Sequence, residues 1–368
     1  MIKLERVQTV THHKPTDQRC LKRRHLAAMK TFPAFHLMTR EPNNQVSTTT
    51  SPVSRVMVTG TPRSGTTWVG HVLSAKDDTL YVHEPFNPNY PSAYTPLRLK
   101  NWFERLDLDA NHKADRQLRA LLDLKIRGCS IKLADFRYPR TLARRVTNCI
   151  QGMARQSHFR SIVIKDPIAA FSADVICERY DMKPIFMYRN PTASVSSMMI
   201  RGWRTDFTQL YAQRKKLESI VPDEIVTLER LAGNPDHSLL ENATHLWRII
   251  NLCILHFLEM HPEWVHVRHE DLIKDPINRF KDMFKQCELE WTESHEQLVK
   301  RSIVTEKPGS KDRRPDVFNI KRNHSQLQNI ADERLSADQI ARIEELTGDV
   351  TELFAQDSSS PKKLQVAG

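Results

Sequence analysis

Cysteine is scarce in this 368-residue chain, and its spacing fits neither a metal site nor a disulfide framework. The six cysteines are Cys20, Cys129, Cys149, Cys177, Cys253 and Cys287. No two of them form the C-x-x-C pair typical of structural zinc sites, and folds built on disulfides are short and dense in cysteine. We therefore expect no metal and no disulfide framework, but reduced, mostly buried thiols.

Long apolar runs are also missing from the first thirty residues, which are broken by Lys, Arg, His and Asp. Nothing there resembles a signal peptide or a membrane anchor, so we expect a cytoplasmic location and an accidental origin for the glycosylation patterns at Asn242 and Asn323. The net charge of +11 suits anionic partners. No helix-turn-helix, zinc-finger or RNP-like pattern is present, so we do not expect nucleic acid to be the partner.

Short apolar runs alternate with helical segments along most of the chain. The runs cover residues 55–59, 80–83, 161–164, 184–188 and 264–268. Buried parallel strands are continuous apolar runs, so the pattern predicts a doubly wound parallel α/β sheet with helices on both faces. We expect one domain over residues 53–355, with helical insertions at about 87–160 and 201–242 and flexible polar tails at 1–52 and 356–368.

Basic clusters occur in both insertions, for example at Arg214, Lys215 and Lys216. Such clusters are usually solvated helix faces, and the alternative is that they line an acceptor cleft.

The first chemically informative motif is Gly60-Thr-Pro-Arg-Ser-Gly65-Thr-Thr-Trp68, which follows an apolar run. A turn of this kind directs backbone N–H groups and a helix N-terminus at one anion. In a site for a nucleoside triphosphate, such a turn ends in Gly-Lys-Ser/Thr, because the Lys reaches the phosphates and the hydroxyl binds Mg²⁺. Here Thr66 and Thr67 follow Gly65, and the cation, Arg63, lies inside the turn. The loop therefore predicts a phosphate site without a magnesium triphosphate.

A second motif of strand, turn and helix contains Arg189 at the end of the strand, followed by Asn190 and Pro191 at the start of the helix. Ser196 and Ser197 lie on this predicted helix. Asn is a good N-cap, Pro fits the first helical position, and an Arg at a strand end offers a planar fork to phosphate oxygens. Two anion sites on one sheet suit a nucleotide that is phosphorylated at both ends.

These motifs resemble those of the sulfotransferases that use 3′-phosphoadenosine 5′-phosphosulfate (PAPS). The resemblance covers about residues 55–354, with further support from 267–272 and 321–325. Pro-Arg in the first loop and His83-Glu84-Pro85-Phe86 after the second strand are closer to the carbohydrate sulfotransferases than to those of phenols and steroids. The resemblance implies a P-loop NTPase-like fold and transfer of a sulfuryl group to an acceptor hydroxyl without a metal, on a carbohydrate or another acceptor.

The resemblance also implies roles for individual residues. The 5′-phosphosulfate would be held by Arg63, Ser64, Gly65, Thr66 and Thr67, and Arg63 would neutralise charge on the bridging oxygen. The 3′-phosphate would be held by Arg189 and Ser197, with Ser196 in reserve, and covered by Lys321 and Arg322. Trp68 would either stack on adenine or belong to the core.

Transfer to a hydroxyl needs a base, and Glu84 is our candidate, with His83 as the rival. Alternation along a strand sends neighbouring side chains to opposite faces, so we expect only one of them in the site. Burial could raise the pKa of Glu84 toward neutrality. Lys165 would assist the leaving group, and Asp166 would orient a loop or pair with a cation.

Glu270 and Asp271 are interpreted as structural. A P-loop nucleotide or small-molecule kinase is the alternative function, although it would need a Lys after Gly65.

Overall fold

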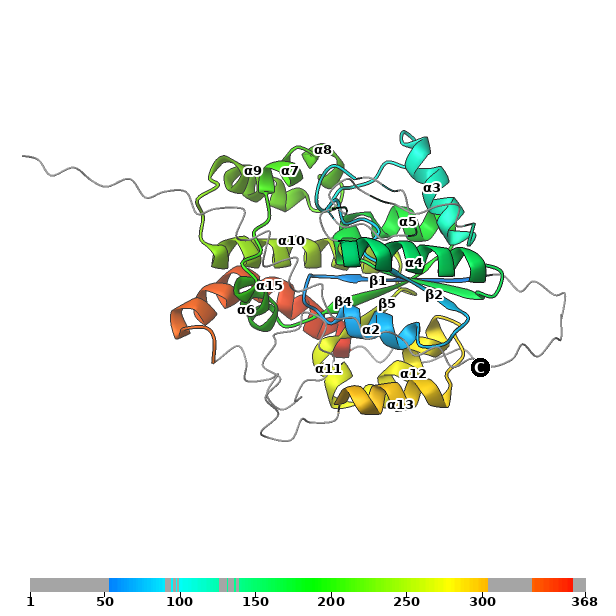
Figure 1. Ribbon diagram of the computed structural model, residues 1–368. Helices are drawn as coiled ribbons and strands as arrows, with labels where there is room; N and C mark the ends of the chain where they lie inside the picture. Colours follow the sequence, from blue (N-terminus) through cyan, green and yellow to red (C-terminus); the bar gives the residue numbers. More distant parts are fainter. Residues whose placement is uncertain are drawn as a thin grey trace, which may run out of the picture. The chain divides into compact units, whose positions relative to one another are not determined.

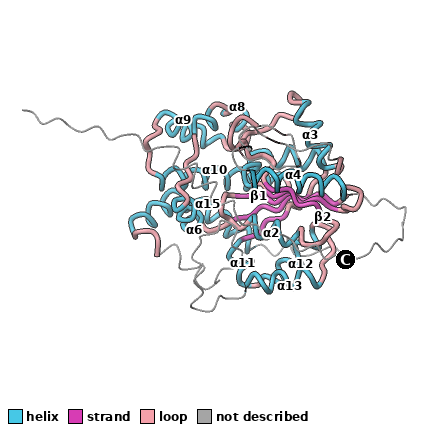
Figure 2. Tube along the Cα trace, viewed as in Figure 1, coloured by secondary structure: helices cyan, strands magenta, loops and turns pink. Residues whose placement is uncertain are grey.

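The computed structural model contains one sheet with helices around it (Figures 1 and 2). Its five strands are parallel and have the order β2-β3-β1-β4-β5. The strands are β1 (Ser54–Gly60), β2 (Thr79–His83), β3 (Ser161–Lys165), β4 (Lys183–Tyr188) and β5 (Val265–Arg268). They coincide with the predicted apolar runs to within a residue at each end. The structure describes residues 53–89, 94, 97, 99–125, 131, 136, 139–303 and 333–359, all of which belong to one compact unit.

Side chains alternate between the two faces of the sheet and fill two separate cores. On β1, Met57 packs into one core, whereas Val56 and Val58 pack into the other. All three are fully buried, and burying a side chain of this size contributes roughly 1.5–3 kcal/mol. The sheet is therefore covered on both faces, as the continuous apolar runs predicted.

The core around Met57 is covered by the larger set of helices (Figure 1). They are α3 (His112–Leu122), α4 (Pro139–Arg155), α5 (Ala173–Tyr180), α6 (Pro191–Ile200), α7 (Phe207–Tyr211), α8 (Arg214–Leu217), α9 (Ile225–Gly233), α10 (Leu239–Met260) and α15 (Ala337–Ser359). The opposite face is covered by α2 (Thr66–Leu73), α11 (His269–Lys274), α12 (Pro276–Gln286) and α13 (Glu293–Ile303). Two short 3₁₀ turns, η2 (Pro167–Ser172) and η3 (Pro222–Glu224), complete the described elements.

The position of β1 decides where a ligand can bind. β1 lies between β3 and β4, so the chain leaves it toward one edge of the sheet and later crosses to the other side. Such a switch point opens a crevice at the carboxyl ends of the strands. All the strands are parallel, so the loops after β1, β2, β3, β4 and β5 meet at that same edge.

Two helices illustrate how the local sequence sets helix ends. Ser238 and Glu241 form a complete capping box at the start of α10, the long helix that packs against α15. The last helix, α15, continues to Ser359, past the boundary expected at residue 355. Polar residues alone do not end a helix. The next proline after the start of α15 is Pro361, and the residue before a proline avoids the helical region, so the helix ends just before it.

The expectation of reduced thiols is wrong at Cys149. Cys149, buried in α4, is disulfide-bonded to a partner outside the described residues. Cys177, Cys253 and Cys287 are free and buried, as expected. The error arises because the spacing of cysteines along a chain does not reveal which of them the fold brings together.

The glycosylation pattern at Asn242 lies on a buried side chain, which donates to the Thr205 carbonyl oxygen. It is therefore not available as an acceptor, whereas Asn323 lies outside the described residues. Among the helices that the structure describes, none is long and apolar enough to span a bilayer.

Candidate active site

The loop after β1 depends on two glycines. Gly60 has a φ of 140°, and a Cβ there would lie 2.3 Å from the Met187 carbonyl oxygen on β4. Gly65 is the N-cap of α2 with a φ of 99°, and a Cβ there would lie 2.6 Å from Cδ2 of His269. Both positions combine a left-handed backbone with a close neighbour, so only glycine fits.

Donor groups of this loop are arranged as an anion cradle. Thr66 and Thr67 begin α2, so their N–H groups have no carbonyl to bond within the helix. The hydroxyl of Ser64 is buried and has no hydrogen-bond partner among the described residues. Unsatisfied buried donors are uncommon and often mark a bound group. The predicted phosphate loop Arg63 to Thr67 thus contains donors of the kind that bind anions at helix N-termini.

Arg63 connects the two predicted anion sites. Its Nε donates to the Ser197 hydroxyl on α6 at 3.0 Å, and its guanidinium lies 6.0 Å from the ring of Trp203. Arg189 Nη1 donates to the carbonyl oxygen of Arg63 at 2.9 Å. Arg63 has a φ of 75°, a strained conformation for a long side chain and one that clusters at functional sites. The first loop, Arg189 and Ser197 therefore form one continuous site.

The structure distinguishes Ser197 from Ser196, the reserve residue. Ser196 donates to the Ala193 carbonyl oxygen of its own helix, whereas Ser197 faces Arg63. Each of the two side chains is mostly buried. Ser197 is therefore the serine that shares the site with Arg63.

Local structure holds Arg189 at the end of β4. Its side chain is buried, and its carbonyl oxygen accepts a hydrogen bond from Trp247 Nε1. Asn190 caps α6 by accepting from the Thr192 N–H, with Pro191 at the first helical position, as predicted. Glu270 accepts from the Asn190 N–H at 2.9 Å. Glu270 is thus structural and ties the ends of β4 and β5 together.

Glu84 follows β2 and lies against the end of β3. Its N–H donates to the Lys165 carbonyl oxygen, and its Oε1 accepts from Lys165 Nζ at 2.6 Å. Its Oε2 accepts from Asn87 Nδ2 at 3.0 Å. Burial raises the pKa of this carboxyl, but the Lys165 charge, His83 and the two hydrogen bonds outweigh burial and lower the pKa to about 2. The expectation of a raised pKa is therefore wrong.

His83 lies beside Glu84, contrary to the expectation from strand alternation. His83 Nε2 is 3.7 Å from Glu84 Oε1, and His83 Nδ1 is 3.2 Å from the Tyr81 hydroxyl. Alternation fails because β2 ends at His83 and Glu84 has a left-handed φ of 45°. Burial lowers the pKa of His83 to about 4, against the opposing influence of Glu84, so the ring is neutral at pH 7.

Asp166 orients a loop, as predicted. Its Oδ2 accepts from the Phe86 N–H at 2.6 Å, and its Oδ1 accepts from the Ile168 N–H at 2.9 Å. Burial, followed by the nearby Glu84 charge, raises the pKa of Asp166. The side chain fixes the turn after Glu84 relative to β3.

Trp68 packs into the core on the α2 side of the sheet. Its ring meets Phe280 edge to face at 5.2 Å, and its Nε1 donates to the Ser302 hydroxyl at 3.0 Å. This arrangement favours the core alternative over adenine stacking. Lys321 and Arg322 lie outside the described residues.

Three further residues of the site were not predicted. Asn87 holds Glu84, His269 packs against Gly65, and Asn251 on α10 donates to the Thr61 hydroxyl at 2.8 Å. The position of His269 directly after the last strand was a usable signal. Asn251 lies in the middle of a long helix, and nothing in its sequence surroundings points to the loop.

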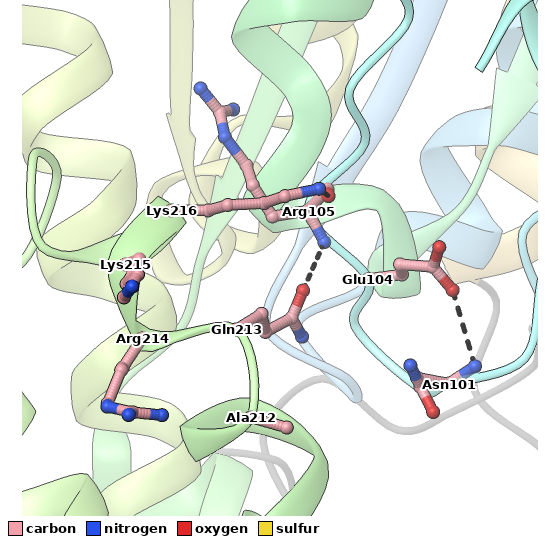
Figure 3. A pocket seen from close by; sticks show the side chains of 8 residues that line it. All are labelled: Asn101, Glu104, Arg105, Ala212, Gln213, Arg214, Lys215 and Lys216. Carbon is pink, nitrogen blue, oxygen red and sulfur yellow. Dashed lines mark hydrogen bonds between the residues drawn. The ribbon is translucent and has the colours of Figure 1, made fainter. Parts of the chain in front are cut away.

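A separate cavity of about 420 Å³ lies between the segment at Arg105 and the turn that begins α8 (Figure 3). It is lined by Asn101, Glu104, Arg105, Ala212, Gln213, Arg214, Lys215 and Lys216. The Arg105 guanidinium is bound by Asp174, and Lys216 Nζ reaches the Arg105 carbonyl oxygen at 3.4 Å. Gln213 accepts from the Arg105 N–H, as the figure shows. None of the lining residues belongs to the two anion sites, so this cavity is distinct from the candidate active site.

Comparisons with solved structures return sulfotransferases at low identity. The sulfotransferase domain of the curacin biosynthetic pathway is 15% identical, with 85% of this chain and 99% of that chain covered and a TM-score of 0.43. The corresponding domain of the Synechococcus PCC 7002 olefin synthase is 16% identical, with coverages of 84% and 98% and a TM-score of 0.44. A mouse sulfotransferase complexed with PAP is 14% identical, with coverages of 83% and 89% and a TM-score of 0.37.

Sequence comparison assigns the family. No curated protein sequence matches the chain. The family model described as "Sulfotransferase family" matches residues 55–293, which is more than half of the chain. The match begins in β1 and includes both anion sites and the Lys165–Glu84 pair. The chain therefore belongs to the sulfotransferase family.

Proposed function

We propose that the protein transfers a sulfuryl group from PAPS to a hydroxyl of a carbohydrate acceptor. The observation that carries this proposal is the hydrogen-bonded connection from Arg189 through Arg63 to Ser197. It joins the loop after β1 to the end of β4 and to Ser197 on α6, so the two predicted anion sites are adjacent and one ligand can reach both. A nucleotide with a 5′-phosphosulfate and a 3′-phosphate has that pattern of charge.

The residues present fit this donor. The buried Ser64 hydroxyl lacks a partner among the described residues, and Thr66 and Thr67 present first-turn N–H groups. The donor supplies the sulfuryl group and its leaving group when bound. In our proposal, residues 63–67 bind its 5′ end, and Arg189 and Ser197 bind its 3′-phosphate.

The protein's contribution is positioning and electrostatics. Arg63 and Lys165 stabilise negative charge that grows as the sulfur–oxygen bond breaks. Glu84 accepts the proton of the acceptor hydroxyl, and Asn87 keeps its carboxylate oriented. We expect a loose, in-line transfer that depends little on covalent participation by the protein.

A carbohydrate acceptor is supported by the resemblance of Pro62-Arg63 and of the segment His83 to Phe86 to the carbohydrate sulfotransferases. Incubation with radiolabelled PAPS and a panel of glycans, phenols and steroids tests it. We expect label on glycans and none on phenols or steroids. Label on phenols alone would assign the protein to another acceptor class.

The kinase alternative is disfavoured by the family assignment and by the threonines at 66 and 67. Independence of divalent metal remains a prediction. Transfer in the presence of a chelator is expected to proceed at the full rate. If the chelator abolished activity and added Mg²⁺ restored it, the prediction of metal independence would be contradicted.

The compartment remains a prediction as well. A cytoplasmic location was expected, but the disulfide at Cys149 opposes it because disulfides persist mainly in oxidising compartments. Peptide mapping of the protein isolated from its native cells, without reductant, determines the state of Cys149. A reduced thiol there would support the cytoplasm.

A further inference from the structure

Each carboxylate oxygen of Glu84, the candidate base, accepts a hydrogen bond from another side chain. Lys165 Nζ binds Oε1 of Glu84 at 2.6 Å, and Asn87 Nδ2 binds Oε2 at 3.0 Å. A carboxylate that holds an ammonium ion is a weak proton acceptor, and the pKa of Glu84 is lowered to about 2. Glu84 becomes a stronger proton acceptor when the Lys165 ammonium leaves it, because the Lys165 charge is the largest influence that lowers its pKa.

Lys165 is placed where it can leave. Its strand, β3, pairs with β1 at Val58 and with β2 at His83, so Lys165 ends between the strand of the phosphate loop and the base. Its side chain is only 4% exposed. The stem passes over α2 at Gly70, where a Cβ would lie 3.0 Å from the Lys165 Cβ. The Lys165 stem therefore lies beside α2, the helix that follows the phosphate loop, while its ammonium group contacts Glu84.

Other titratable groups around the pair add little positive charge. His71 on α2 and His83 on β2 are neutral at pH 7, because burial lowers the pKa of each to about 4. Tyr81 is neutral because burial raises its pKa, and Asp166 adjoins the pair with a raised pKa. Among these groups, the Lys165 ammonium is the cation that faces Glu84.

We propose that donor binding draws Lys165 from Glu84 to the anion at the donor's 5′ end, and that this exchange makes Glu84 the base. This inference rests on the proposed function. The donor brings negative charge beside β1, which offers Lys165 an alternative partner. Asn87 is uncharged and stays on Oε2, so Glu84 keeps its orientation. Once the ammonium has moved, burial becomes the dominant influence and raises the pKa of Glu84.

Proton uptake on binding of 3′-phosphoadenosine 5′-phosphate (PAP) tests the exchange. Calorimetric titrations at pH 5.5 in two buffers of different ionisation enthalpy measure the protons taken up per PAP bound. Wild type should take up about 0.5–1 proton more than Glu84→Gln, since a carboxylate whose pKa rises on binding must bind a proton. Proton exchange by the phosphates of PAP is common to both proteins and cancels. Equal uptake by the two proteins would overturn the proposal.

A second variant tests the same exchange without ligand. In Lys165→Met the ammonium is permanently absent, so Glu84 should titrate several pH units higher than in wild type. Carbon NMR of selectively labelled glutamate carboxyls reports this midpoint. An unchanged midpoint would show that Lys165 does not control Glu84. If Lys165→Met does not fold, the comparison of proton uptake between wild type and Glu84→Gln still tests the proposed exchange.

The two failures are distinguishable. If wild type does not bind PAP at all, the proposed function fails. If PAP binds and uptake is the same with and without the Glu84 carboxylate, the donor site stands and only the exchange is refuted.

Discussion

Ser197 and Ser196 provide a matched pair for testing the site of the 3′-phosphate. They are neighbours on α6 and both mostly buried, but only Ser197 faces Arg63, and Ser196 bonds its own helix. Ser197→Ala therefore removes a donor from the site, whereas Ser196→Ala removes a hydroxyl of the same size outside it. We expect Ser197→Ala to weaken PAP binding and Ser196→Ala to leave it nearly unchanged.

The magnitude follows from the charge of the ligand. A hydrogen bond to a charged group contributes roughly 1.5–3 kcal/mol, so Ser197→Ala should lower PAP affinity by about 10- to 150-fold. Arg189→Ala should cost more, on the order of 2–5 kcal/mol, because it removes one partner of a buried charge pair. Arg189 also donates to the Arg63 carbonyl oxygen, so this variant should weaken AMP by up to about tenfold.

Calorimetric titration of PAP and AMP against the four proteins measures these effects. AMP lacks the 3′-phosphate, so Ser197→Ala should bind it as wild type does. Equal weakening of both ligands by Ser197→Ala would refute the assignment of the 3′-phosphate to this residue. An effect of Ser196→Ala as large as that of Ser197→Ala would show that the loss arises from disturbance of α6.

Three further predictions concern the loop and the buried histidines. Arg63→Ala should lower kcat by about a hundredfold or more, and a loss below about tenfold in steady-state assays would contradict its role. Gly65→Ala should abolish PAP binding in calorimetry, because the residue needs a positive φ and its Cβ would collide with His269; retained binding would contradict this. His71 and His83, whose pKa values are lowered to about 4, bind protons only in the unfolded state between about pH 6.5 and 4, so stability should fall as pH drops through this window. The free energy of unfolding should fall by about 2 kcal/mol per histidine at pH 5. Urea titrations at pH 7.5 and pH 5 measure this loss. An unchanged pH dependence in His71→Gln would contradict the contribution of that ring.

Features carried by neighbouring residues were predictable from the sequence. The strands are continuous apolar runs because both faces of the sheet are covered, and the glycines at 60 and 65 mark backbone conformations that other residues cannot adopt. Asn190 and Pro191 define the start of α6 through local capping rules. These signals place the residues of the two predicted anion sites at the carboxyl edge of a parallel sheet.

Features that depend on distant contacts were not predictable. The pKa of Glu84 is set by Lys165 on another strand, and the sequence does not give their distance. The Arg63 side chain turns to Ser197, which is far away along the chain. The direction of Glu84 follows from a left-handed residue at a strand end, where alternation no longer applies.

Most of the positive net charge does not come from the domain that contains the candidate active site. Residues 1–52 alone contain nine Lys and Arg against three Asp and Glu. More than half of the excess of +11 therefore lies outside the described domain. The argument for an anionic ligand rests on the positions of Arg63, Arg189 and Lys165 and not on total charge.

The most direct test of the proposed function is sulfuryl transfer from radiolabelled PAPS to the glycan panel by wild type and Glu84→Gln, with PAP affinity measured in parallel. The account predicts labelled glycan with wild type and a loss of about a hundredfold or more in turnover with Glu84→Gln, because the amide cannot accept a proton. It also predicts that the variant binds PAP at least as tightly as wild type, because Lys165 is no longer held by a carboxylate. Turnover of Glu84→Gln at the wild-type rate, or PAP binding without transfer to any acceptor by wild type, would contradict it.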